Sequence, residues 1–281
     1  MRPTLTVPFV HLVVSSQQAF VLAAVLVCIW LGPRWAEKLA GFERRTTRCA
    51  LLCLGLAAFV GGRAHFVAGQ WGMFADRPWR ALYIWSGGLH AAGAVVLLAV
   101  AVPLVCRWMG LPVARFADAF VPTVGVGIAI ARLGCFSYGC CFGTVCRWPW
   151  CLSFPRDTYI YEYHTSLGLL PADGASTAPI HPLQLYFAGA GLLLTLIGFR
   201  LHRRWRYDGK VTLVILLVYA LSAAGLELFR ADSAPRVYWG PLPQLEWVAL
   251  GIAAVSGAAL VVAEINHRPR RGAGTRRCGE V

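Results

Sequence analysis

Apolar residues gather along this chain in long runs, and charged residues fall mainly between the runs. A helix needs about 20 mostly apolar residues to cross the hydrocarbon core of a bilayer, and several runs reach that length. The pattern predicts an all-α integral membrane protein with seven transmembrane helices. The predicted spans are residues 7–31, 49–68, 88–107, 119–138, 184–201, 210–229 and 242–264.

Composition supports the membrane class and removes one alternative. The 281 residues are 58% hydrophobic and 14% charged, and the mean hydropathy is +0.60. The net charge of +13 comes almost wholly from arginine, since Lys38 and Lys210 are the only lysines. In a membrane protein such charge reports topology first, so no nucleic-acid partner is expected.

The basic residues also predict the orientation. With the N-terminus outside, 17 arginines and lysines fall in the inner segments and 7 in the outer ones. Cytoplasmic loops carry the excess of basic residues, so we expect a multi-pass protein with its N-terminus outside and its C-terminus in the cytoplasm. The first apolar run is too long for a signal peptide and is expected to remain as a span.

The predicted domain organisation follows from these spans. Residues 1–264 are expected to form a single seven-span membrane domain, with an extracytoplasmic cap at about 139–183 between spans four and five. That segment is the longest connection and is rich in Cys, Trp, Tyr, Pro and Gly, which indicates a folded unit. Residues 265–281 are Arg- and Gly-rich and are expected to be a disordered, basic cytoplasmic tail.

Charged residues inside the predicted spans are the first candidates for chemistry, because charge in a membrane is costly. Arg63 and Arg132 lie near the outer ends of their spans, where an arginine can also reach the interface by snorkelling. Glu227 and Arg230 are spaced i, i+3 and can form a structural ion pair. Together the three arginines predict an electropositive pocket for a lipid phosphate, which guanidinium groups bind bidentately.

Histidines and cysteines give further candidates. His65, His90 and His181 fall near the outer ends of spans, and each can act as a general base or fill a hydrogen-bonded structural role. Five cysteines follow the pattern C-x4-C-C-x4-C-x4-C at an outer face, where disulfides persist. The open alternatives are disulfides, free thiols and a metal site; the spacing lacks the C-x2-C of structural zinc, so no metal is predicted. The candidates for a disulfide are Cys140, Cys141, Cys146 and Cys151.

The stretch 131–143 resembles the signature of bacterial prolipoprotein diacylglyceryl transferases, seven-span enzymes whose motif runs roughly Gly-Arg-x-Gly-Asn-Phe-x-Asn-Gly-Glu-x-x-Gly. The residues that stand in register are Arg132, Gly134, Phe136, Gly139 and Gly143. Other stretches resemble family motifs in the same order. They are Gly62-Arg63, Trp85-Ser86-Gly87-Gly88-Leu89, Asp118 with Pro122, His181-Pro182-Leu183-Gln184-Leu185-Tyr186, and Glu227-Leu228-Phe229-Arg230.

This chain departs from the family pattern at several positions. Cys135 stands where the signature has asparagine, and Cys140 stands where it has an acidic residue. Ala92 occupies the place of a motif histidine, two residues after His90, and Ala223 replaces an arginine one turn before the motif glutamate. The Gly-Cys-Phe-x-x-Gly-Cys-Cys-Phe-Gly form resembles a cysteine-rich branch of the family.

The resemblance implies transfer of a diacylglyceryl group from phosphatidylglycerol to the lipobox cysteine of a preprolipoprotein, at the outer face of the bacterial inner membrane. The implied partners are phosphatidylglycerol, preprolipoprotein signal peptides and membrane lipid, with no cofactor and a monomeric state. Two alternatives remain: a divergent or inactive relative that binds anionic phospholipid, and a cysteine-based redox or metal-handling membrane protein. A base is expected at His90, with thiol activation by the arginines alone as the rival.

The implied site residues fall into three groups. Arg132, Glu227 and His90 are the catalytic candidates. Arg63, Arg132 and Arg230 are expected to bind the lipid phosphate. The structural positions of the motifs are Gly87, Gly88, Asp118, Gly134, Gly139, Gly143, His181, Gln184 and Tyr186.

Overall fold

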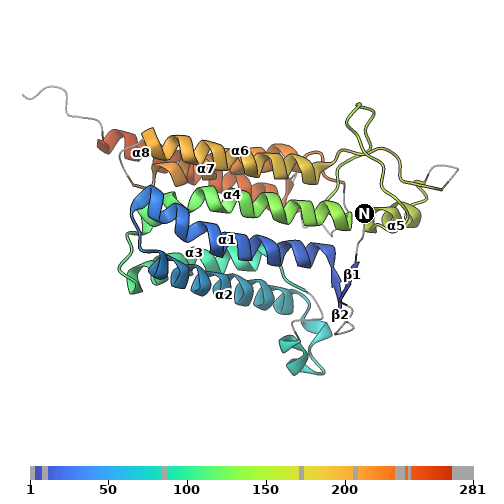
Figure 1. Cartoon of the computed structure of the whole chain (residues 1–281). Coiled ribbons are helices and arrows are strands. Elements are labelled where there is room, and N and C mark those ends of the chain that lie inside the picture. Colours follow the sequence, from blue (N-terminus) through green and yellow to red (C-terminus); the bar gives the residue numbers. More distant parts are fainter. Residues whose placement is uncertain are drawn as a thin grey trace, which may run out of the picture.

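The computed structural model is a predominantly helical bundle (Figure 1). It describes residues 4–7, 12–83, 88–170, 174–204, 208–231, 238–239 and 242–267. Within them, six helices are long and apolar enough to cross a membrane, and one shorter apolar helix covers residues 92–108. This is the pattern expected of a multi-pass membrane protein.

The helices and strands have the following bounds. The long helices are α1 (Ser16–Ala40), α2 (Arg44–Gly69), α3 (Ala91–Trp108), α4 (Val113–Tyr138), α6 (Leu183–Arg204), α7 (Lys210–Glu227) and α8 (Gln244–His267). The short helical elements are η1 (Trp71–Met73), η2 (Pro78–Leu82) and α5 (Tyr159–Ser166). Two small antiparallel hairpins pair β1 (Thr4–Val7) with β2 (Leu12–Ser15) and β3 (Tyr238–Trp239) with β4 (Leu242–Pro243).

The predicted start of the first span is wrong. Residues 4–7 and 12–15 pair as strands, and α1 begins only at Ser16. A capping box fixes that start: Ser15 Oγ accepts from the Gln18 N–H, and Gln18 Oε1 accepts from the Ser15 N–H. A run rich in β-branched residues is apolar enough for a span but also suits a strand, so hydropathy alone set the boundary too early.

Smaller boundary differences have a similar cause. α2 and α4 begin at Arg44 and Val113, about one and a half turns before the predicted starts at 49 and 119, because the polar residues that precede the apolar runs are also helical. α8 reaches His267, so the first three residues of the predicted tail belong to a helix. Residues 268–281, on which the rest of that prediction falls, lie outside the described residues.

Helix α4 is the centre of the bundle. Figure 1 shows it between α1 on one side and α6 and α7 on the other, with α2 and α3 beyond α1. Glycines allow the close packing: a Cβ at Gly125 would lie 2.5 Å from the Gly191 carbonyl oxygen of α6, and one at Gly134 would lie 2.5 Å from Phe20 Cβ of α1. The middle of α4 and its C-terminal part are therefore packed closely against their neighbours.

Asp118 ties together the helix ends at the start of α4. Its buried carboxylate accepts hydrogen bonds from the N–H groups of Gly209 and Thr212, each at 2.7 Å, and from Thr212 Oγ1 at 2.6 Å. These contacts cap the first turn of α7, where free N–H groups favour a negative charge. The motif aspartate is therefore a structural anchor at the end of the bundle opposite to the last turn of α4.

The connection between α4 and α6 packs over the last turn of α4. Phe142, Phe154, Ile160 and Ile180 form a fully buried apolar cluster within it. Isolated bridges join its segments, among them those between Val145 and Ile180 and between Leu152 and Ile180. The connection thus has a core of its own, which holds the end of α4 in place.

Candidate functional site

The signature stretch forms a tight turn at the C-terminal end of α4. Gly139 takes the left-handed conformation (φ +85°) that commonly ends a helix, and its N–H donates to the Cys135 carbonyl at 2.8 Å. The Cys140 N–H donates to the same carbonyl at 3.1 Å. Cys141 also has a positive φ of 58°, which is costly for a residue with a side chain. The turn therefore folds the chain back sharply over the helix end.

Backbone hydrogen bonds hold the end of this turn against two distant segments. The Gly143 N–H donates to the His181 carbonyl at 3.1 Å, and the Thr144 N–H donates to the Phe229 carbonyl at 2.7 Å. A Cβ at Gly143 would lie 2.6 Å from His181 Cβ, so only glycine fits there without displacement. Backbone conformation thus explains the glycine at 139, and close approach explains the glycine at 143.

Arg230 joins the end of α7 to the turn. Its Nη1 lies 3.2 Å from Oε1 of Glu227, which is only 6% exposed, so the ion pair that the i, i+3 spacing indicated is present. Its Nη2 donates to the Cys141 sulfur at 3.7 Å. The arginine thus links a buried carboxylate to a cysteine of the signature.

Arg132 lies in the last two turns of α4 and is half-buried. Its guanidinium carbon stands 4.3 Å from the centre of the Phe187 ring of α6, a cation–π contact. Within the part of the chain that the structure describes, this side chain has no hydrogen-bond or ion-pair partner. A half-buried guanidinium group whose five N–H donors have no acceptor among the described residues is well suited to bind an anion.

We call Arg132, Arg230, Cys135, Cys140 and Cys141 the arginine–cysteine cluster. The three sulfur atoms lie within 4.8 Å of one another. Hydrogen bonds from the other two thiols, and then the charges of Arg230 and Arg132, lower the pKa of Cys141 well below that of an ordinary thiol. Hydrogen bonding with Cys135 and Cys141 raises the pKa of Cys140. Within the cluster, negative charge is therefore favoured on the Cys141 sulfur, beside two guanidinium groups.

Arg63 is used differently from the other two arginines. It is buried, and it donates from Nε to the Ala81 carbonyl at 2.8 Å, from Nη1 to the Gly88 carbonyl at 3.0 Å and from Nη2 to the Tyr83 carbonyl at 3.0 Å. These contacts fasten the segment after η2 to helix α2. We therefore leave Arg63 out of the arginine–cysteine cluster, although the sequence grouped it with Arg132 and Arg230.

His90 stands at the N-terminal cap of α3 and is exposed. Its Nδ1 lies 3.1 Å from Nδ1 of His65, and its ring packs against Phe66. Among the described residues, no contact joins it to the arginine–cysteine cluster. Gly88 has a φ of +84° and precedes the helix, whereas Gly87 lies outside the described residues.

The motif around His181 supports the turn from α6. The Gln184 side chain is fully buried and donates from Nε2 to the Cys140 carbonyl at 2.7 Å. His181 Nδ1 lies 3.1 Å from the Tyr186 hydroxyl, and its ring packs against Phe229. Gln184 thus holds the backbone of Cys140, while Tyr186 contacts His181, whose carbonyl accepts from the Gly143 N–H.

A disulfide joins Cys146 and Cys151, whose Cα atoms are 6.2 Å apart. They are two of the four cysteines that the sequence marked as candidates. Cys140 and Cys141 are free thiols in the structure.

Sequence reasoning missed two residues of the site. Gln17 donates from Nε2 to the Cys135 sulfur at 3.9 Å, and Phe187 carries the contact to Arg132. The polar residues at the start of an otherwise apolar helix were a usable signal for Gln17. Phe187 gave no signal, since one aromatic residue in a span is unremarkable.

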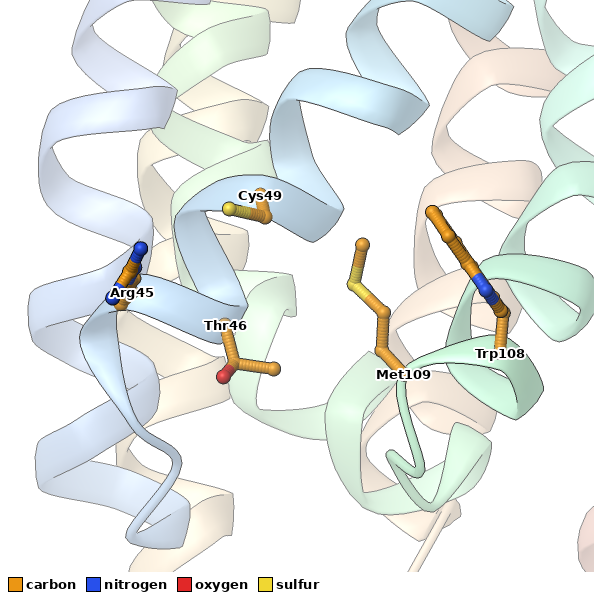
Figure 2. Close-up of a pocket in the computed structure, with 5 residues that line it drawn as sticks. All are labelled: Arg45, Thr46, Cys49, Trp108 and Met109. Carbon is orange, nitrogen blue, oxygen red and sulfur yellow. The ribbon is translucent and has the colours of Figure 1, made fainter.

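One hollow of about 360 Å³ lies at the other end of the bundle (Figure 2). It opens between the first turn of α2 and the end of α3 and has a mainly apolar lining. The lining residues are Arg45, Thr46, Cys49, Trp108 and Met109. Its lining contains one thiol, that of Cys49, and no acid–base pair.

Comparisons with known proteins agree with the motif resemblance. A family model described as prolipoprotein diacylglyceryl transferase matches residues 9–263. Similar curated relatives carry the name phosphatidylglycerol–prolipoprotein diacylglyceryl transferase. The protein of Nocardia farcinica is 29% identical over 222 residues, which are 77% of this chain and 45% of the relative. That of Parasynechococcus marenigrum is 30% identical over 85% of this chain and 83% of the relative. That of Synechococcus elongatus is 31% identical over 76% of this chain and 72% of the relative.

Proposed function

We propose that this chain, which belongs to the prolipoprotein diacylglyceryl transferase family, transfers a diacylglyceryl group from phosphatidylglycerol to the lipobox cysteine thiol of a preprolipoprotein. The observation that carries the proposal is Arg132. It is a half-buried arginine with no polar partner among the described residues, at the same helix end as Arg230 and three thiols. An anionic headgroup would supply the missing partner.

The phosphate of the lipid suits this position. A guanidinium group binds phosphate through two parallel hydrogen bonds, which are stronger than neutral ones. Arg230 adds a second positive charge, which the buried carboxylate of Glu227 holds in a fixed orientation. The two arginines would bind the headgroup and then stabilise the charge that develops on the departing glycerol phosphate.

The reaction moves an alkyl carbon from oxygen to sulfur. The thiol of the peptide loses its proton, its sulfur attacks the glyceryl carbon, and the bond from that carbon to the phosphate oxygen breaks. The thiolate is the reactive form, and a positive field lowers the cost of making it. Arg132 is our candidate for the catalytic group, and Glu227 is a positioning residue that acts through Arg230.

Other motif residues have supporting roles in this proposal. Arg63 positions the segment after η2, and Gln184 positions Cys140. Asp118 holds the opposite end of α4. His90 remains a candidate base only if substrate binding brings the thiol to the start of α3, since its described contacts are with His65 and Phe66.

A second candidate function is lipid binding without transfer. It is favoured by Ala92, which stands where the family has a histidine. Both functions use the same arginines, so binding of phosphatidylglycerol alone would not separate them.

We further propose a seven-span arrangement in the bacterial inner membrane, with α3 as the additional span beside the six longer helices. The N-terminus would lie outside, the connection between α4 and α6 would form an extracytoplasmic cap, and the C-terminus would be cytoplasmic. The protein would act as a monomer on lipid and signal-peptide substrates that enter from the bilayer. A reporter fused after Val281 should then read cytoplasmic; an external reading would reverse the proposal.

Transfer itself is the decisive experiment. The purified protein is incubated in detergent with phosphatidylglycerol labelled in its acyl chains and with a peptide that contains a lipobox. The expected product is a labelled peptide, with release of glycerol phosphate. A peptide with serine in place of the lipobox cysteine is the matched control and should stay unlabelled. Lipid binding without label on the cysteine peptide would support the binding function instead.

A further inference from the structure

Three cysteine sulfurs meet at the end of α4. Cys135 comes from the last turn of the helix, and Cys140 and Cys141 come from the turn that follows it. All three sulfurs lie within 4.8 Å of one another. Four sulfurs around a tetrahedral zinc ion, with bonds of about 2.3 Å, lie about 3.8 Å apart, so this spacing is close to that of a metal site.

The backbone turn creates this convergence. Two left-handed residues, Gly139 and Cys141, reverse the chain so that residues 140 and 141 fold back over Cys135. The left-handed conformation of Cys141 is unfavourable, because the side chain crowds the backbone there. Backbone strain of this kind collects at functional sites, and here its result is that the third sulfur joins the other two.

Three thiols are more than a disulfide requires. Cys140 and Cys141 are adjacent in sequence, where disulfide geometry is rarely reached. A disulfide from Cys135 to either Cys140 or Cys141 would leave the third cysteine without a disulfide partner. The neighbouring pair, Cys146 and Cys151, already forms the disulfide of this connection. A tripod of thiols is, by contrast, a known arrangement of ligands for zinc.

The surroundings of the sulfurs suit metal-bound thiolates. Gln17 Nε2 donates to the Cys135 sulfur at 3.9 Å, and Arg230 Nη2 donates to the Cys141 sulfur at 3.7 Å. Gln184 holds the backbone of Cys140. Outer groups of this kind orient and tune metal ligands. Three thiolates with Zn²⁺ carry one net negative charge, which the guanidinium group of Arg230 would offset.

We propose that Cys135, Cys140 and Cys141 bind one Zn²⁺ ion and leave its fourth position for the thiolate of the substrate peptide. This inference rests on the proposed transfer function and deepens it. Catalytic zinc sites have three protein ligands and one open position, and a thiol that coordinates the metal is deprotonated. The metal would thus favour deprotonation of the peptide thiol, the role of a base that this chain lacks at Ala92.

The step balances without an oxidant. The peptide thiol releases its proton to solvent as its sulfur becomes the fourth ligand. A sulfur electron pair then forms the bond to the glyceryl carbon, and the electron pair of the broken carbon–oxygen bond leaves with glycerol phosphate, which Arg132 and Arg230 would hold. The zinc ion remains Zn²⁺ throughout, and the thioether product is a weak ligand that can leave.

Metal content and a cobalt spectrum test the site directly. The purified protein should contain about one zinc per chain by elemental analysis. After chelation and addition of Co²⁺ it should show the visible bands of tetrahedral cobalt and the intense near-ultraviolet bands of thiolate ligands. Cys140→Ser should lose the metal and these bands. The matched control, Cys49→Ser, changes an exposed cysteine at the other end of the bundle and should keep both.

The outcomes distinguish this inference from the proposed function. Wild-type protein that binds neither Zn²⁺ nor Co²⁺ under reducing conditions, or a Cys140→Ser variant that binds both, overturns the metal site, whatever the transfer assay shows. A disulfide within the trio in the isolated protein, with no metal uptake after reduction, overturns it as well. A shift of the cobalt bands when the lipobox peptide is added, absent with its serine analogue, supports the open position even if transfer fails. Full transfer by metal-free protein rejects the catalytic role of the ion.

Discussion

Arg132→Lys is the most direct test of the phosphate site. The substitution keeps a positive charge at the end of α4 but replaces the planar fork with a single ammonium group. In the structure the guanidinium makes a cation–π contact with Phe187 at 4.3 Å and no hydrogen bond within the described residues. Loss of the guanidinium group should therefore affect ligand binding and catalysis much more than folding.

The size of the effect follows from the hydrogen bonds that the lysine cannot make. A hydrogen bond to a charged group contributes about 1.5–3 kcal/mol, and each 1.36 kcal/mol is a factor of ten in rate. Loss of one of two parallel bonds should thus lower kcat/KM by about 10- to 150-fold. Arg132→Ala removes the charge as well and should lower it further, while the melting temperature of either variant should change by no more than a few degrees.

The assay is the transfer of labelled diacylglyceryl to the lipobox peptide, at matched protein concentration. Arg115→Lys is the matched control, because Arg115 lies on the same helix, over the Phe42 ring at 5.8 Å, but at the other end of the bundle. It should stay within about twofold of wild type, since it lies far from the proposed phosphate site. Wild-type turnover by Arg132→Ala in a folded protein would refute the phosphate role.

Three further predictions concern the support of the site. Gly143→Ala should reduce transfer at least tenfold, because its Cβ would lie 2.6 Å from another Cβ; Gly55→Ala, with nothing within 4 Å, should not. Asp118→Asn removes an acceptor from the first turn of α7 and should lower the free energy of unfolding by about 1–3 kcal/mol. The melting temperature should fall while activity is retained below it; an unchanged melting temperature would contradict the role of Asp118 as a structural anchor. Burial lowers the pKa of His164, so the folded state favours the neutral imidazole. The contribution of His164 to stability is therefore complete above the pKa of the unfolded chain, about 6.5, and is lost as the pH falls below that value. Amide protection factors in residues 159–166, which are exchange rates corrected for the intrinsic effect of pH, should therefore be lower at pH 5 than at pH 7.5, and His164→Phe should remove most of that difference.

The sequence by itself determined the class of the molecule and pointed to the location of its candidate site. Long apolar runs have few solutions in a bilayer other than helices, because backbone groups need partners within the same segment. The density of glycine, cysteine and arginine around Arg132 marked the end of α4, and the spacing of Glu227 and Arg230 predicted their ion pair. These features depend on local spacing and composition, which a single sequence contains.

Tertiary structure decided the role of each group at that site. Arg63 and Arg132 look alike in sequence, yet one donates to backbone carbonyls and the other faces an aromatic ring. The first apolar run divided into a hairpin and a helix at a capping box. The C-x4-C-C spacing does not resemble a metal site until two left-handed residues, one of them Cys141, fold the chain back and bring the three sulfurs together. Such outcomes depend on where distant segments meet, and the local pattern of residues does not contain that information.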